Sequence, residues 1–312
     1  SLIVTLVLVF SMIINPEASS VAVNAAFAVV TGKFGWLFLI FCVFCFTFLL
    51  WLAFGRYGNV KFGRPDEGPE FSYFSYIAML FCAGIGGGIM YWSFVEPIYY
   101  FQSPPLGLEP GSVLAAEWAV MYPQFHWGFS AWAIYAILTF PIAYSLWIRR
   151  DPYIRLSTSS KGAIGKLADG WIGTLFDVLV VFGIIGAVGT SLGLAVPLIS
   201  SLFSYLFGVE ESMLLNVFII ALWTLIFGAS VYRGLSKGIK ILSDINVYLA
   251  IILVVFVLLA GPTVYILSMW TNSFGLLLDN FFRISFWLDP IAKGGFPEGW
   301  TVFYWAWWIA YA

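Results

Sequence analysis

Long apolar runs alternate with short polar segments along this chain. A membrane-spanning helix needs about 20 consecutive apolar residues, and runs of that kind recur while most of the charge falls between them. The predicted helical segments are residues 2–14, 34–54, 71–101, 113–148, 171–207, 213–232, 241–267 and 300–312. We expect the first to be only the remains of a span and the last to be incomplete at Ala312. The pattern predicts an all-α polytopic membrane protein with about eight spans in this chain.

Four glycines interrupt the third segment: Gly84, Gly86, Gly87 and Gly88. Each weakens a helix by about 1 kcal/mol relative to alanine, so together they cost about 3 to 4 kcal/mol. The spacing of Gly84 and Gly88 also suits close packing of two helices. Because the glycines are followed by Glu96 and a proline, we favour a discontinuous helix that lines a cavity, as in many transporters.

Two other features modify the helical pattern. Pro123 and Pro141 should kink the fourth segment, because each removes a backbone donor. Residues 272–286 are too short and too polar to span a membrane, yet their polar side chains recur near helical spacing among phenylalanine and leucine. This pattern predicts an amphipathic helix in the membrane interface.

Composition and charge agree with a membrane protein. The chain is 62% hydrophobic and only 10% charged, whereas soluble domains are about 25% charged. Basic residues concentrate in alternate loops, and eleven of the 14 lie in three of them: Arg56, Lys61, Arg64, Arg149, Arg150, Arg155, Lys161, Lys166, Arg233, Lys237 and Lys240. The positive-inside rule places these loops in the cytoplasm. We therefore predict a multi-pass protein of the inner or plasma membrane, with no nucleic-acid partner.

Residues that carry enzymatic chemistry are scarce. His126 is the sole histidine, and a lone histidine on a helix is more often a hydrogen-bonded structural residue than a proton carrier. Cys42, Cys45 and Cys82 lie in apolar runs, where packing is a better explanation than metal binding or redox chemistry. H-E-x-x-H does not occur; G-x-S-x-G spacing is present at 189–193 and 234–238, but no strand, which a nucleophile elbow requires, is predicted before either. We predict neither enzymatic activity nor a resident metal or cofactor.

Aromatic side chains form two clusters that an anchoring role explains poorly. Trp127, Trp132 and Tyr135 lie within the fourth segment, and Trp307 and Trp308 lie in the last. Tryptophan usually sits at the membrane interface, but these residues lie deeper along their segments. Ring faces attract a desolvated cation by about 2 kcal/mol or more. The clusters predict a site for a quaternary ammonium ion, which binds without gaining or losing a proton.

Three motifs identify a family resemblance. They are AGIGGGIMYW at 83–92, followed by Glu96 and Pro97; FHWGFSAW at 125–132; and GWTVFYWAWW at 299–308. The last of these is highly specific. Together with 189–194 and 289–297, they make nearly the whole chain resemble the betaine/choline/carnitine transporter (BCCT) family.

The resemblance implies a LeuT-like inverted-repeat transporter fold with twelve spans in the parent protein. Residues 1–54 would be two leading helices, 71–268 the first five-helix repeat with a broken third helix, and 300–312 the truncated start of the second repeat. Residues 272–286 match the family's curved interfacial helix, which contributes to trimer contacts. A homotrimer in the lipid bilayer is therefore expected.

The resemblance also implies site residues. The substrate box would use Tyr99, Trp127, Trp132, Tyr135, Trp307 and Trp308. Trp300 would stand in the outer vestibule, and the helix break would comprise Gly84, Gly86, Gly87 and Gly88. If Na⁺ is the coupling ion, backbone carbonyls of Cys82 and Ile85 are its expected ligands from this half of the protein, with Asn246 as the position that decides coupling.

Three positions bear on the branch of the family. Gly88 stands where choline-specific members tend to carry aspartate, and Tyr311 resembles the carnitine/γ-butyrobetaine exchanger. Sodium-independent exchangers carry an arginine where this chain has Asn246. The resemblance implies secondary transport of carnitine, γ-butyrobetaine or glycine betaine by alternating access with sodium coupling. Sodium-independent exchange and a non-transporting osmolyte sensor stay open as alternatives.

Overall fold

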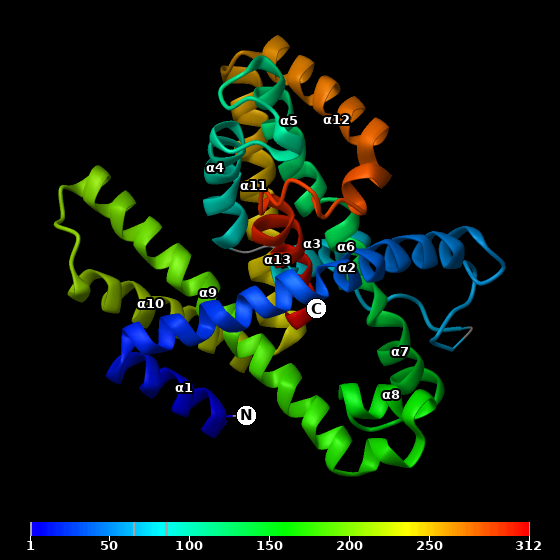
Figure 1. The fold of residues 1–312 in the computed structure, drawn as a ribbon. Helices are drawn as coiled ribbons and strands as arrows, with labels where there is room; N and C mark the ends of the chain where they lie inside the picture. Colours follow the sequence, from blue (N-terminus) through cyan, green and yellow to red (C-terminus); the bar gives the residue numbers. More distant parts are fainter. Residues whose placement is uncertain (1, 65, 85–86, 312) are drawn as a thin grey trace. The chain divides into compact units, whose positions relative to one another are not determined.

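The computed structural model describes residues 2–64, 66–84 and 87–311, and every regular element in these ranges is a helix (Figure 1). The longer helices are α1 (Leu2–Ile14), α2 (Pro16–Phe54), α3 (Tyr73–Gly84), α4 (Gly87–Gln102), α5 (Val113–Trp127), α6 (Phe129–Ile137), α7 (Thr139–Ala143), α8 (Leu156–Ile164), α9 (Trp171–Phe207), α10 (Met213–Tyr232), α11 (Lys240–Ala260), α12 (Thr263–Ser285) and α13 (Phe303–Tyr311). Short helical turns are η1 (Pro105–Gly107), η2 (Tyr144–Ile148), η3 (Gly165–Asp169), η4 (Leu235–Ile239) and η5 (Pro297–Val302).

Five helical stretches of the described chain are long and apolar enough to cross a membrane: Pro16–Phe54, Val113–Ile148, Trp171–Phe207, Met213–Tyr232 and Leu235–Ala260. Helices α3 and α4 make a sixth if the bent pair is one span. The terminal helices α1 and α13 have 13 and 9 residues, so neither reaches the length of a span by itself. The protein is thus a multi-pass membrane protein. The sequence predicted about eight spans, and the described residues contain five or six helical stretches that could be spans.

The chain divides into two compact units. Unit 1 comprises Ser1–Glu67, Tyr99–Ala187 and Phe274–Ala312, and unit 2 comprises Gly68–Ile98 and Val188–Ser273. All the predicted box residues belong to unit 1, whereas Cys82 and Asn246 belong to unit 2. The assignment of helices to an inverted repeat stays a prediction.

The glycine-rich segment separates α3 from α4, as predicted. The axes of the flanking helices differ by 64°, so the two halves are distinct helices. Ile85 and Gly86, two of the predicted site positions, lie outside the described residues. Pro97 lies inside α4, which continues past it to Gln102.

The predicted kinks in the fourth segment occur at different places. Helix α5 continues through Pro123 and ends at Trp127, because Gly128 leaves helical geometry with φ −98° and ψ −135°. A Cβ atom at Gly128 would collide with the carbonyl oxygen of Gln124, so the turn requires glycine. The second interruption falls at Leu138, next to Ile137, whose carbonyl the ring of Pro141 crowds from four residues ahead.

The boundary between the seventh span and the interfacial helix was predicted wrongly. The span ends at Ala260 rather than 267, and α12 begins at Thr263 rather than 272. Gly261 ends α11 in an extended conformation, with its amide donating to the carbonyl of Val257 at 3.0 Å. Pro262 immediately precedes α12, and its carbonyl accepts from the amide of Ile266 at 3.0 Å.

The second helix is longer than the predicted 34–54, since α2 already begins at Pro16. Asn15 caps it, with its side-chain oxygen accepting from the amide of Ala18 at 3.1 Å. Pro16 and Glu17 are favourable in the first turn. Residues 17–34 contain no proline and one glycine, Gly32, so the helix continues into the predicted span.

Candidate functional site

Helices α5, α6 and α13 of unit 1 bring most of the predicted box residues together. Trp127 ends α5, while Trp132 and Tyr135 lie on the same face of α6. In an uninterrupted helix, Trp127 and Trp132 would point about 140° apart. The turn at Gly128 changes that relation, and both indole rings meet Trp308.

The rings contact one another at short distances. From the centroid of Trp308, the rings of Trp127, Trp132 and Tyr135 are 6.0, 6.1 and 6.2 Å away. Trp127 and Trp307 are 5.9 Å apart at an interplanar angle of 78°, and Trp132 and Tyr135 are 5.6 Å apart at 90°. We call these five residues the aromatic cluster: Trp127, Trp132, Tyr135, Trp307 and Trp308. Trp308 is fully buried at its centre.

Tyr99 and Trp300 lie at one end of a chain of rings that leads to this cluster. Tyr99 is 52% exposed, and its ring is 5.8 Å from that of Trp300. Trp300 lies 6.3 Å from Tyr304, which in turn lies 5.5 Å from Trp127. The structure therefore places Tyr99 beside the predicted vestibule residue, with Tyr304 between them and the aromatic cluster.

Two important residues were not in the predicted box. Tyr304 is fully buried and contacts both Trp127 and Trp307. Tyr100, rather than its neighbour Tyr99, is the buried member of that pair. Both lie beside predicted residues in aromatic runs. Only the rotation of each helix about its axis, relative to the neighbouring elements, distinguishes them from those residues.

His126 joins three elements behind the aromatic cluster. Its Nδ1 is 3.0 Å from the hydroxyl of Tyr100 on α4, and its Nε2 is 3.0 Å from Oγ1 of Thr301 on η5. The imidazole is fully buried, with the ring of Tyr304 at 4.9 Å. Both ring nitrogens have partners, which is the arrangement of the structural histidine predicted from the sequence.

Two of the predicted ion-site residues meet within unit 2. The side-chain amide of Asn246 on α11 donates to Sγ of Cys82 on α3 at 3.3 Å. The same thiol lies 3.8 Å from the carbonyl oxygen of Ser243. Asn246 is thereby held beside the end of α3, immediately before the break.

A second polar contact joins the same two helices, two residues earlier on α11 and seven residues earlier on α3. Asp244 accepts from Lys240 at 2.8 Å and from the hydroxyl of Ser75 at 3.0 Å. The side chains of Lys240 and Asp244 are 31% and 18% exposed, so water only partly screens the pair. Helix α3 is thus tied to α11 at two levels.

Residues 1–312 match the protein-family model described as BCCT, betaine/carnitine/choline family transporter. The chain belongs to this family. Membership fits the prediction that the protein is not an enzyme, since the family's members are transporters.

Betaine, carnitine and choline share a trimethylammonium group, and the aromatic cluster has the chemistry that recognises it. Tryptophan faces are the strongest cation–π partners among protein side chains, and the cluster contains four of them. Glu96, the only acid of the broken span, is fully buried on α4. It stays a candidate for a functional carboxylate.

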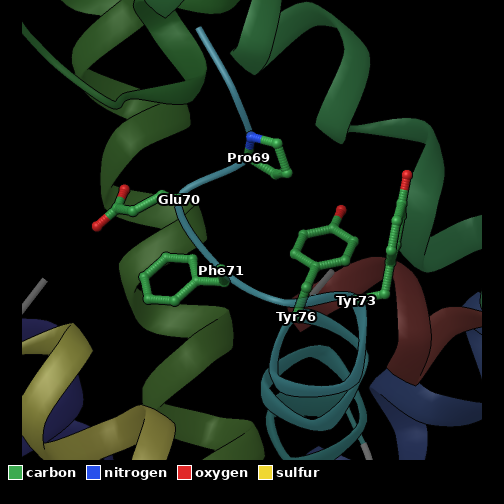
Figure 2. Close-up of a pocket in the computed structure, with 5 residues that line it drawn as sticks. All are labelled: Pro69, Glu70, Phe71, Tyr73 and Tyr76. Atoms are coloured by element: carbon green, nitrogen blue, oxygen red, sulfur yellow. The ribbon is translucent and has the colours of Figure 1, made fainter.

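A cavity of about 330 Å³ lies elsewhere, at the start of α3 in unit 2. Its lining residues are Pro69, Glu70, Phe71, Tyr73 and Tyr76 (Figure 2). Tyr73 is 82% exposed and Tyr76 is 47% exposed, as expected for tyrosines at a membrane interface. None of the predicted substrate residues lines this cavity, so we place the candidate site at the aromatic cluster.

Proposed function

We propose that this protein is a secondary transporter of a trimethylammonium zwitterion, namely carnitine, γ-butyrobetaine or glycine betaine. The single observation that carries the proposal is the contact of Trp127, Trp132 and Tyr135 with Trp308 in unit 1. These side chains come from segments more than 170 positions apart in the sequence, and family membership gives their meeting a functional context.

Ring geometry explains how such a cluster would bind and release its ligand. Edge-to-face contacts place the positive edge of one ring against the negative face of the next, and the angles of 74° to 90° in four of the pairs are of this kind. A trimethylammonium group competes for the same faces. Binding would therefore part the rings and replace ring edges with methyl groups, so the cluster can close again when the substrate leaves.

The broken span supplies the movement in this proposal. Helices α3 and α4 are separate elements at an angle of 64°, so one half can tilt without bending the other. Alternating access would expose the aromatic cluster first to one side of the membrane and then to the other.

Sodium coupling is the preferred mode, with Asn246 as its basis. The side-chain amide of Asn246 donates to the thiol of Cys82. A residue on α11 is therefore hydrogen-bonded to α3, the half-helix that ends at the break. Asparagine carries no charge that would replace a cation there. Carbonyls of Cys82 and Ile85 are the proposed Na⁺ ligands, and sodium-independent exchange of carnitine for γ-butyrobetaine is the alternative.

Uptake in proteoliposomes tests the function. Labelled carnitine and glycine betaine are supplied with an inward sodium gradient, with no sodium, and with unlabelled substrate loaded inside. We expect concentrative uptake that requires sodium. Equal exchange without sodium would support the antiporter and overturn the role given to Asn246. Saturable binding without uptake in any condition would instead indicate a sensor.

A further inference from the structure

Residues 149–170 of unit 1 form a polar connection that we call the basic loop. It links the apolar stretches Val113–Ile148 and Trp171–Phe207, each long enough to cross a membrane. Since both neighbours are spans, the loop begins and ends at one membrane surface. It contains α8 and η3 (Figure 1, green) and is therefore folded close to that surface.

The basic loop has a large excess of exposed positive charge. Its five basic side chains are all exposed, and they are Arg149, Arg150, Arg155, Lys161 and Lys166. Both of its acidic residues have partners: Asp151 accepts from the hydroxyl of Ser145 at 2.6 Å, and Asp169 pairs with Lys161 at 2.8 Å. Within the described residues, the other four cations form no ion pair with a carboxylate.

Aromatic and aliphatic side chains lie among these cations. The guanidinium of Arg155 lies 4.6 Å from the ring centre of Tyr153, and that of Arg149 lies 5.5 Å from Tyr144. Large apolar residues of the loop and of its two junctions are exposed as well, namely Trp147, Ile148, Ile154, Leu167 and Trp171. Cations mixed with exposed tryptophan, tyrosine and isoleucine suit the headgroup layer of a bilayer. There the apolar part of a side chain can contact lipid while its polar part stays hydrated.

We propose that the basic loop binds the headgroups of anionic phospholipids in the leaflet beside it. Arginine can hold a phosphate by two parallel hydrogen bonds, and an anionic surface attracts each nearby cation enough to raise affinity about fivefold. The apolar neighbours favour a lipid over an acidic soluble protein, because they can enter the acyl boundary while the cations stay with the phosphates. This inference is independent of the transport function.

Native mass spectrometry of the detergent-solubilised full-length protein can measure the binding. Phosphatidylglycerol and phosphatidylcholine are titrated at about 0.1 M salt, where the Debye length is about 10 Å. We expect phosphatidylglycerol to bind at least tenfold more tightly than phosphatidylcholine. In the triple variant Arg150→Gln, Arg155→Gln, Lys166→Gln, its affinity should fall about 100-fold. This variant keeps Arg149, because the guanidinium of Arg149 packs near Gly162 and its removal could disturb the fold of the loop.

Two controls separate charge from fold. Lys161→Gln with Asp169→Asn removes an exposed ion pair without changing net charge and should bind phosphatidylglycerol as the wild type does. Arg150→Lys with Arg155→Lys keeps the charge and should lose less than tenfold. The proposal is overturned if the triple variant keeps wild-type affinity, or if both lipids bind equally. It is also overturned if millimolar inorganic phosphate displaces the lipid completely, since the site would then serve a free anion.

Discussion

At the scale of single residues, His126 shows how much the aromatic cluster depends on side chains behind it. The imidazole bonds Tyr100 on one side and Thr301 on the other, and all three side chains are buried. The residue next to it is Trp127, and Thr301 precedes Tyr304 by one turn. The two hydrogen bonds therefore fix the positions from which the cluster is built.

Replacing His126 with phenylalanine should destabilise the protein by about 2 to 4 kcal/mol, because two buried hydroxyl groups lose their hydrogen bonds to the imidazole. Thermal unfolding in detergent measures the effect. His126→Gln, whose amide can still reach Thr301, should lose less than the phenylalanine variant. Equal melting temperatures for His126→Phe and the wild type would show that these bonds contribute nothing.

The sequence predicted which aromatic residues lie in the site better than it predicted which residues they contact. Trp127, Trp132, Tyr135, Trp307 and Trp308 were all expected in one box, and their rings do meet. Tyr304 and Tyr100 were missed because neighbouring aromatic residues offered equally good candidates. Which ring of a pair is buried depends on how a helix is rotated against its neighbour, and a single sequence does not contain that angle.

At the scale of elements, Gly128 is the position that shapes the site. A Cβ atom there would collide with the carbonyl oxygen of Gln124, and the turn it permits separates α5 from α6. Gly128→Ala should therefore disturb the contact of Trp127 and Trp132 with Trp308 and reduce substrate affinity at least tenfold.

The matched control is Gly228→Ala. Gly228 lies inside α10, where a Cβ atom would meet no other atom within 4 Å, so alanine should be neutral or stabilising by about 1 kcal/mol. Half-saturation for uptake and the melting temperature are measured for both variants. Similar behaviour of the two would show that the turn at Gly128 has no special role.

The contact between α3 and α11 gives a second prediction at this scale. Asp244→Asn removes the carboxylate that pairs with Lys240 and accepts from the hydroxyl of Ser75. Hydrogen exchange should then become faster in the first turns of α3. Ser75→Ala, which leaves the ion pair intact, should show a smaller change. Unchanged exchange in Asp244→Asn would mean that Asp244 does not hold α3.

Element boundaries were predictable where the chain carries a local signal. Helices α9 and α10 have the predicted bounds, and Ser212 caps α10 by accepting from the amide of Leu215. The start of α12 was missed because residues 264–267 continue the apolar run across Pro262. Hydropathy cannot separate two helices that join without a polar linker, although the Gly261–Pro262 pair was a usable signal.

At the scale of the whole molecule, the aromatic cluster belongs to one compact unit and the α3–α11 contacts belong to the other. In the proposed transport by alternating access, substrate binding at the cluster would have to be linked to movement of the broken span. The contribution of ring faces to substrate affinity is the central claim. Trp308 contacts all four other members of the cluster, so it is the residue that tests this claim.

The decisive measurement is the half-saturation constant for uptake of glycine betaine and carnitine by Trp308→Leu. Leucine keeps apolar volume but removes the ring quadrupole, so the constant should rise about 30-fold, as expected for about 2 kcal/mol. Trp308→Phe should lose less, and Trp36→Leu, at a 54% exposed position of α2, should behave as the wild type. Membrane insertion should be normal in all three. Unchanged uptake kinetics in Trp308→Leu would contradict the aromatic site.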